Sequence, residues 1–266
     1  MPELHDDDLA VFAASGAPAL PEGLAPGHID RDGARLWHAT VGDGPPVVLL
    51  HGGLGHSGNW GHQVPALVAA GRKVVLIDTR GHGRSTRDGR PFHYAQLAAD
   101  LRAVLDALAI ERAPLVGWSD GACTALLLAR EAPERVASVF FFGCNMHPDG
   151  ARPFVPTPEI DRVFSRHAKD YADLSATPEA FQPLVDDVSR MQASEPVWGD
   201  ADLADVRVPV TVVHAERDEF IHRAHAEHLA ERIPGAGFVL LPEVSHFAPL
   251  QRPGGFTSAI LDSLAR

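Results

Sequence analysis

One serine lies in a sequence context that could activate its hydroxyl group for attack. Gly117-Trp118-Ser119-Asp120-Gly121 matches the pattern Gly-x-Ser-x-Gly between an apolar run and a helical pattern. A sharp strand-to-helix turn of this kind strains the serine backbone and exposes the hydroxyl, and small flanking residues allow it to close. Chance alone gives about 0.1 such matches in a chain of this composition, so the pattern needs support from other residues.

A base and an acid for this serine follow later in the chain. A serine hydroxyl becomes a nucleophile when a histidine removes its proton, and a carboxylate keeps that histidine in the right tautomer. Asp218 follows a predicted strand at 208–214, and His246 follows a predicted strand at 237–241. Because carboxyl ends of parallel strands meet at one sheet edge, we expect both side chains to reach Ser119. Glu216 and Glu219 are alternative orienting acids.

Two backbone N–H groups must also hold the negatively charged oxygen of the reaction intermediate. Asp120, directly after the serine, provides one donor, and the loop His51-Gly52-Gly53-Leu54-Gly55 should provide the other. We favour Gly53 as this second donor, with Leu54 as the alternative. Leu54, Trp118 and Asp120 are also candidate substrate contacts, although Trp118 could equally belong to the core.

The elements that must position these residues alternate between strands and helices. The sequence predicts strands at 28–30, 34–40, 46–50, 73–78, 114–118, 136–143, 208–214 and 237–241. It predicts helices at 63–70, 94–108, 122–130, 223–232 and 255–264. Nearly continuous apolar strands alternating with helices indicate an α/β fold, with a mostly parallel central sheet and helices on both faces.

Changes in composition and in strand patterns along the chain suggest three parts. Residues 1–27 read as a loosely attached N-terminal extension with a short helix near 9–14. Residues 28–146 and 201–266 form the predicted core. Residues 147–200 are rich in proline and poor in strand patterns, which indicates a small inserted helical cap over the carboxyl edge of the sheet.

Composition excludes several classes of partner. A formal net charge of -12 argues against nucleic acid and anionic membrane surfaces. No apolar run is long enough to span a membrane, and the start Met1–Asp8 is acidic where a signal peptide would be basic. Cys123 and Cys144 form no disulfide framework, so we expect a cytoplasmic protein with free thiols. Nothing in the sequence indicates the oligomeric state.

Two other patterns suggest ligands that we do not expect. Gly53-x-Gly55-x-x-Gly58 with Asp78 twenty residues beyond matches the dinucleotide fingerprint, but chance gives about 0.2 matches and the catalytic residues would stay unexplained. His222, His225 and His228 lie at helical spacing, which is more typical of a solvated helix face than of a metal site. We therefore predict neither a cofactor nor a metal.

Five linked features together resemble the serine hydrolases of the α/β-hydrolase fold over about residues 28–266, except the cap. These features are the His51-Gly52 turn, the loop from Asp78 to Ser85, the Ser119 turn, and the Asp218 and His246 loops. The resemblance implies hydrolysis of a carboxylic ester, lactone or related acyl bond of a small molecule through an acyl-enzyme. An acyltransferase, a carbon–carbon bond hydrolase and a non-catalytic ligand-binding receptor are the alternatives.

The serine turn itself is similar to that of valacyclovir-hydrolase-like esterases, in which the acid after the serine is implicated in holding a substrate amino group. Ala122 departs from the glycine that is usual at its position. The resemblance implies that Asp120 could bind a cationic amine of the substrate. Alternatively, its carboxylate caps the helix N-terminus, where an anion is favoured by about 0.3–1 kcal/mol.

Overall fold

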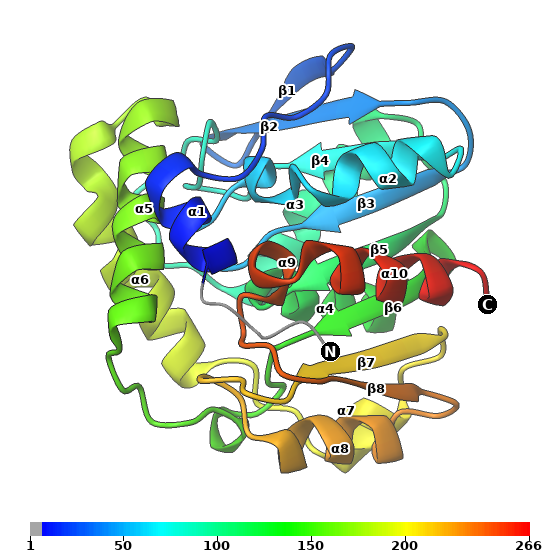
Figure 1. The fold of residues 1–266 in the computed structure, drawn as a ribbon. Helices are drawn as coiled ribbons and strands as arrows, with labels where there is room; N and C mark the ends of the chain where they lie inside the picture. The colour runs from blue at the N-terminus through cyan, green and yellow to red at the C-terminus, as the bar shows by residue number, and fades with distance from the viewer. Residues whose placement is uncertain (1–6) are drawn as a thin grey trace.

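The computed structural model describes residues 7–266 and builds them around one eight-stranded sheet (Figure 1). Its strand order is β1-β2-β4-β3-β5-β6-β7-β8. β2 pairs antiparallel with both of its neighbours, β1 and β4, and the strands from β4 to β8 pair parallel. The strands are β1 (Ala25–Arg31), β2 (Ala34–Val41), β3 (Pro46–Leu50), β4 (Lys73–Ile77), β5 (Ala113–Trp118), β6 (Val136–Phe142), β7 (Val210–Ala215) and β8 (Gly237–Leu241).

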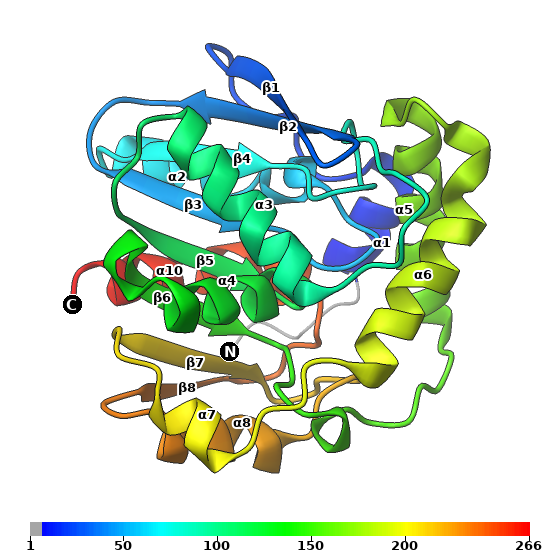
Figure 2. The ribbon, with the colours of Figure 1, turned by 180° about the vertical axis from the view of Figure 1, so that it is seen from behind.

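Helices cover both faces of this sheet, as Figures 1 and 2 show from opposite sides. One face carries α2 (Gln63–Ala69), α9 (Ala248–Gln251) and α10 (Pro253–Leu264), and the other carries α3 (Tyr94–Ala107), α4 (Asp120–Glu131) and α8 (Arg223–Arg232). Successive side chains of a strand point to opposite faces. Val47 and Leu49 therefore enter one core cluster, whereas Val48 and Leu50 enter the other, and all four are fully buried.

The predicted fold class, a mostly parallel sheet between two helical layers, is confirmed. The strand predicted at 208–214 begins instead at Val210, and the preceding Pro209 has no N–H for the ladder. The carbonyl of Pro209 still accepts a hydrogen bond from the N–H of Val139 in β6. The helix predicted at 223–232 and the strand predicted at 237–241 have the predicted bounds.

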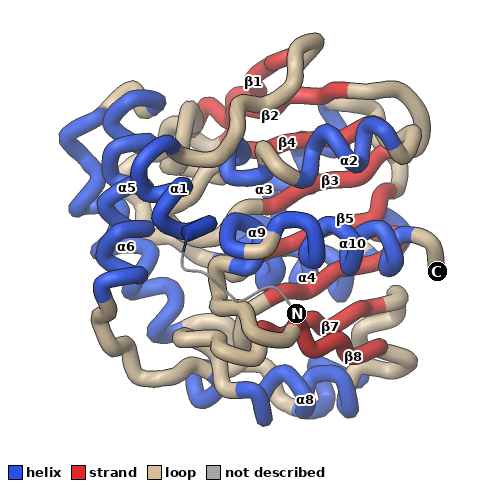
Figure 3. Tube along the Cα trace, viewed as in Figure 1, coloured by secondary structure: helices blue, strands red, loops and turns tan. Residues whose placement is uncertain are grey.

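Two helices extend past the carboxyl ends of the parallel strands, at the left of Figures 1 and 3. They are α5 (Pro158–Leu174) and α6 (Phe181–Ser194), and the short α7 (Asp200–Ala204) follows them. Thr157 caps α5 by accepting a hydrogen bond from the N–H of Ile160, and Pro158 occupies the first turn, where no N–H is needed. Residues 147–200 thus contain helices where the sequence predicts a helical cap.

The first described helix is attached more firmly than the sequence suggests. The helix predicted near 9–14 is α1 (Asp7–Ser15), and it packs against α5 and α9. Leu9 and Phe12 are only 1% and 3% exposed, so the expectation of a loosely attached extension is wrong for this helix. The acidic start of the chain lies outside the described residues, up to Asp6. Within residues 7–266, none of the helices combines the length and hydrophobicity of a membrane span.

Candidate active site

The turn between β5 and α4 places Ser119 in a backbone conformation that only glycine adopts without strain. Its φ is 53° and its ψ is -126°. A Cβ atom on Gly117 would collide with the backbone of Ala122, and one on Gly121 would collide with the carbonyl of Leu50. Both flanking glycines are therefore needed for the chain to turn this sharply. Ser119 remains partly exposed although its two neighbours are buried.

The structure brings Asp218 and His246 together, as the sequence predicts. His246 Nδ1 lies 3.2 Å and 3.1 Å from the two carboxylate oxygens of Asp218. Their loops follow β7 and β8, and the side chains of His246 and Asp218 are only 7% and 0% exposed. The indole of Trp118, next to Ser119, lies 6.3 Å from the His246 ring and donates a hydrogen bond to the His246 carbonyl. The histidine is thus held beside the serine turn.

Burial and charge act in opposite directions on this pair. Burial raises the pKa of Asp218, but the neighbouring His246 and the N–H groups of Phe220 and Ile221 outweigh it, so the pKa lies below its ordinary value. Burial lowers the pKa of His246, but the Asp218 carboxylate outweighs this effect and raises it above the ordinary value. The pair therefore favours an ionised Asp218 and a histidine that readily accepts a proton.

The two alternative acids bind backbone groups instead of the His246 ring. Glu219 Oε2 accepts a hydrogen bond from the His246 N–H at 2.9 Å, and Glu216 Oε2 accepts one from the Glu243 N–H at 2.8 Å. Asp218 is the carboxylate that faces the imidazole nitrogen. This geometry favours Asp218 as the orienting acid, and Glu219 fixes the loop that carries the histidine.

The loop after β3 lies against the serine turn. A Cβ on Gly52 would lie 3.1 Å from the Ser119 Cβ, and a Cβ on Gly53 would lie 2.5 Å from the Asp120 carboxylate. Leu54 has a left-handed φ of 63° and packs partly against the core. The two residues predicted to supply oxyanion N–H groups, Gly53 and Asp120, are therefore neighbours across the site.

Trp118 supports the site from its buried side. Its ring is 3% exposed and packs edge-on against Trp60 and Phe247, in addition to its hydrogen bond to the His246 carbonyl. These contacts belong to the core cluster beneath the site. The prediction that Trp118 contacts substrate rests on its position beside Ser119 alone.

Asp120 has partners that the sequence does not reveal. The Tyr94 hydroxyl donates to its carboxylate at 2.7 Å, and the Gln192 amide donates to both oxygens at 3.0 and 3.1 Å. Tyr94 begins α3 and Gln192 lies on α6, so no local pattern links either residue to the serine turn. Among the described residues, the hydrogen bonds that the Asp120 carboxylate accepts come from these two side chains and not from the first turn of α4. Burial raises its pKa more than these neutral donors lower it.

The glycine-rich pattern at 53–58 builds a turn that Asp78 fixes. The Asp78 carboxylate is fully buried, accepts a hydrogen bond from the Ser57 N–H at 2.8 Å and pairs with Arg84 at 2.9 Å. These contacts leave it unable to bind a ribose, as a dinucleotide site requires. Within residues 7–266, no group of three metal-ligating side chains is arranged to hold an ion, His222, His225 and His228 included.

The sequence also aligns with known proteins. A family model described as the alpha/beta hydrolase fold matches residues 45–202. The dihydrolipoyllysine-residue acetyltransferase component of the acetoin cleaving system of Pseudomonas putida is 30% identical, over 91% of this chain and 70% of that protein. Serine hydrolase BPHL of Mus musculus is 28% identical, over 88% of this chain and 84% of that protein.

Solved structures show the same likeness. The structure of Est816, described as an N-acyl homoserine lactone degrading enzyme, is 27% identical with a TM-score of 0.70, over 89% of this chain and 99% of that one. Sequence and structure therefore agree with the family that the serine, acid and histidine loops predict. The chain belongs to the α/β-hydrolase fold family.

Proposed function

We propose that the protein is a serine hydrolase that cleaves a carboxylic ester, lactone or related acyl bond of a small molecule. The observation that carries the proposal is the buried Asp218–His246 pair beside a serine held at a φ of 53°. Strain at a turn of this kind persists where a reactive side chain must be presented. Relatives named as a serine hydrolase and a lactone-degrading enzyme support the same chemistry.

In the proposed mechanism, Ser119 Oγ attacks the carbonyl carbon while His246 Nε2 takes its proton. Asp218 accepts a hydrogen bond from Nδ1–H and stabilises the imidazolium. The tetrahedral intermediate collapses, and His246 gives the proton to the leaving oxygen. Water, activated by the same histidine, then hydrolyses the acyl-enzyme and frees Ser119.

The backbone N–H groups of Gly53 and Asp120 are the proposed donors to the oxyanion. Their neighbouring positions at the serine turn support this role. Each donor of this kind lowers the barrier by roughly 3–4 kcal/mol in analogous sites, because it is fixed before charge develops. The side chain at position 120 can vary without removing its N–H, so the carboxylate is free to serve another purpose.

Acyl transfer to an acceptor other than water is the second candidate. The relative from Pseudomonas putida, which is named as an acetyltransferase component, favours it. Transfer uses the same acyl-enzyme and differs only in what attacks it, so products formed with added alcohols or thiols distinguish it from hydrolysis. A carbon–carbon bond hydrolase would use the same triad and would release a carbanion equivalent instead of an alcohol.

The direct test is the Ser119→Ala variant with an activated aryl ester. We expect loss of nearly all esterase activity and of labelling by a fluorophosphonate probe, with unchanged thermal unfolding. Full activity in this variant would refute the mechanism. An unlabelled wild-type chain that bound esters without turnover would instead indicate a ligand-binding receptor.

Asp120 is the proposed contact for a substrate amine. Within residues 7–266, the donors to its carboxylate are the neutral groups of Tyr94 and Gln192, so an ammonium group would supply the missing cation. We expect Asp120→Ala to lose at least tenfold more kcat/KM on an α-amino ester than on the matched ester without the amine. Equal losses on the two esters would remove the amine from the proposal.

A further inference from the structure

The turn after β3 sets the direction of the Gly53 N–H, one of the two proposed oxyanion donors. The Gly52 carbonyl and the Gly53 N–H belong to one planar peptide unit, so a contact that fixes the carbonyl also fixes the N–H. The N–H of Gly55 donates a hydrogen bond to this carbonyl at 3.1 Å. Within the turn, Leu54 has a left-handed φ of 63°, which persists only where the surroundings hold the backbone. The turn therefore needs contacts from outside itself to keep this shape.

The chain after β4 supplies one set of these contacts. The N–H of Thr79 donates to His51 Nε2 at 3.1 Å, so His51 carries its proton on Nδ1, which lies 2.8 Å from the Gly52 carbonyl oxygen. Burial lowers the pKa of His51 to about 4, so this neutral form persists at neutral pH. Farther along, the Ser57 N–H donates to the buried carboxylate of Asp78 at 2.8 Å. The turn is thus fixed from the side of the sheet.

His56 reaches from the same turn in another direction, toward α5. It precedes the short helix η1 (Ser57–Trp60), and its Nδ1 accepts a hydrogen bond from the Gly58 N–H at 3.0 Å. The neutral ring therefore carries its proton on Nε2, which lies 3.5 Å from Oδ2 of Asp170 on α5. The two side chains are only 12% and 9% exposed, so water competes little for this contact. His56 thus joins the oxyanion turn to a helix of the 147–200 segment.

Asp170 is itself held in place on α5. The guanidinium of Arg166, one helical turn earlier, lies 2.5 Å from Asp170 Oδ1. Arg166 is confined as well, since a Cβ on Gly16, directly after α1, would lie 2.5 Å from its Nη2. Burial raises the pKa of Asp170, but His56 and Arg166 outweigh this effect and hold the pKa below its ordinary value. Asp170 therefore presents an ionised carboxylate to His56.

We propose that Asp170 is a positioning residue for the oxyanion site and that it acts through His56. Asp170 holds the His56 ring, and His56 holds the start of η1 and the end of the turn that directs the Gly53 N–H. The 147–200 segment thereby contributes to the chemical step, although Ser119, Asp218 and His246 lie outside it. This inference rests on the proposed function, because it assigns to the turn a role in holding an oxyanion.

The deciding variant is His56→Asn, which separates this link from the hydrogen bonds within the turn. The shorter side chain can still accept from the Gly58 N–H, since asparagine is a favoured capping residue, but it no longer reaches Asp170. Arg166 and Asp170 stay paired, so no buried charge is left alone. We expect kcat on an activated aryl ester to fall about tenfold with less than a twofold change in KM, because a displaced donor stabilises the transition state less well.

Phenylboronic acid gives a second measurement of the same effect. It forms a tetrahedral adduct with a catalytic serine and so resembles the reaction intermediate. Its inhibition constant should rise in His56→Asn by about the factor that kcat loses. Thermal unfolding of the same sample reports any change in stability separately.

Variants of α5 test the other end of the link. The amide oxygen of Asp170→Asn can still accept from His56 Nε2, so its loss in kcat should be smaller than that of Asp170→Ala. Because Asp170→Ala also leaves Arg166 without its carboxylate and can unfold the chain, the comparison is made with folded protein only. Asp173→Asn is the matched control, since Asp173 lies on the same helix, pairs with Lys169 and is 58% exposed. Its kcat and KM should stay within twofold of wild type.

Three results would overturn the inference. Wild-type kcat in folded His56→Asn would show that the link is not used, whereas Ser119→Ala tests the proposed function on its own. An equal loss of kcat in Asp173→Asn would indicate a general effect of α5. Amide hydrogen exchange of Gly55, followed by NMR, examines the turn without catalysis and should become severalfold faster in His56→Asn. Unchanged exchange would show that His56 does not hold the turn.

Discussion

Asp218 and Asp120 are two buried carboxylates at the same edge of the sheet, in surroundings that act on them differently. Backbone N–H groups and the His246 ring surround Asp218 and lower its pKa. The hydroxyl of Tyr94 and the amide of Gln192 surround Asp120, whose pKa burial raises. A carboxylate that must stay charged is thus held by the backbone of its own loop. The other is held by side chains from α3 and α6.

The largest contrast should appear in catalysis. Asp218→Asn should lower kcat about 10⁴-fold, because an amide neither keeps the histidine tautomer nor stabilises the imidazolium. Steady-state kinetics on an aryl ester measure this loss. Glu219→Gln is the matched control, since Glu219 accepts a hydrogen bond from the His246 backbone N–H while Asp218 faces the ring, and its loss should be far smaller. A larger loss for Glu219→Gln than for Asp218→Asn would reverse the assignment of the orienting acid.

The same two carboxylates should affect stability with opposite signs. A lowered folded-state pKa stabilises the fold above the unfolded pKa, so Asp218→Asn should cost about 1–3 kcal/mol at neutral pH and less in acid. A raised pKa marks an unfavourable charge, so Asp120→Asn should gain about 0.5–2 kcal/mol at neutral pH. This gain should vanish as the pH falls through the Asp120 pKa. Urea unfolding at neutral pH gives both signs, and measurements near pH 4 for Asp120 and below pH 3.8 for Asp218 follow their loss. Equal signs at neutral pH would contradict the comparison.

A smaller effect is expected from the residue of α6 that reaches Asp120. Gln192→Ala removes the side-chain amide of α6 that donates hydrogen bonds to the Asp120 carboxylate. We expect KM to rise severalfold, by the loss of roughly 1 kcal/mol in holding α6 over the site, with little change in kcat. Gln182→Ala is the control, because Gln182 binds Asp186 within the same helix. Identical kinetics for the two variants would show that the Gln192 contact is not used.

The smallest effect concerns the titration of His246, which both carboxylates raise. Because the base must be neutral, kcat/KM should rise with pH through a pKa above the ordinary histidine value. Asp218→Asn should move the titration to lower pH, and Asp120→Asn should move it in the same direction by less. NMR titration of the His246 ring measures both shifts even where activity is lost. A larger shift in Asp120→Asn would contradict the structure.

Residues whose positions depend on nearby sequence could be predicted from the sequence. The turn leaves no room for a Cβ at Gly117 or Gly121. This constraint involves only five consecutive residues, so a short sequence pattern is enough to detect it. Asp218 and His246 were predictable because each follows a strand, and parallel strands end at one edge. The mostly parallel sheet could also be predicted, because its strands are apolar runs that alternate with helical patterns.

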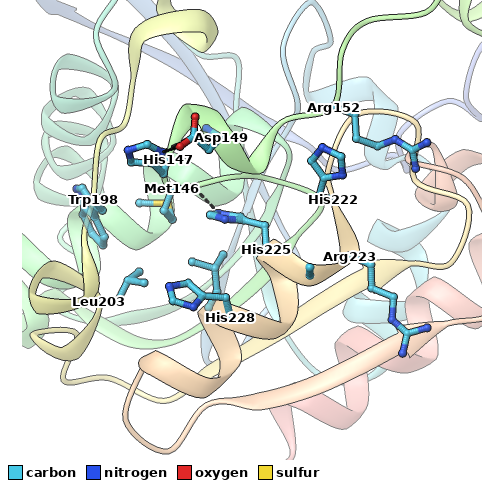
Figure 4. Close-up of a pocket in the computed structure, with 12 residues that line it drawn as sticks. Met146, His147, Asp149, Arg152, Trp198, Leu203, His222, Arg223, His225 and His228 are labelled. Carbon is cyan, nitrogen blue, oxygen red and sulfur yellow. Dashed lines mark hydrogen bonds and ion pairs between the residues drawn. The ribbon is translucent and has the colours of Figure 1, made fainter.

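Contacts between distant side chains could not be predicted in this way. Gln192 approaches Asp120 only because α6 is placed over the sheet edge, which no periodicity specifies. The spacing of His222, His225 and His228 predicts one solvated helix face. His225 is nevertheless partly buried, because the chain after β6 lies against α8 and the Met146 N–H donates a hydrogen bond to its ring (Figure 4). The buried contacts of α1 depend on α5 and α9, which come far later in the chain.

Helix α1 links the beginning of the chain to two parts of the site. It packs on α5 and on α9, and α9 begins two residues after His246. If α1 undocked, it would uncover the apolar side of α5 that Leu9 and Phe12 now cover, so we expect truncation of α1 to speed amide hydrogen exchange in α5. Residues far from the nucleophile in sequence thus hold in place a helix of the 147–200 segment.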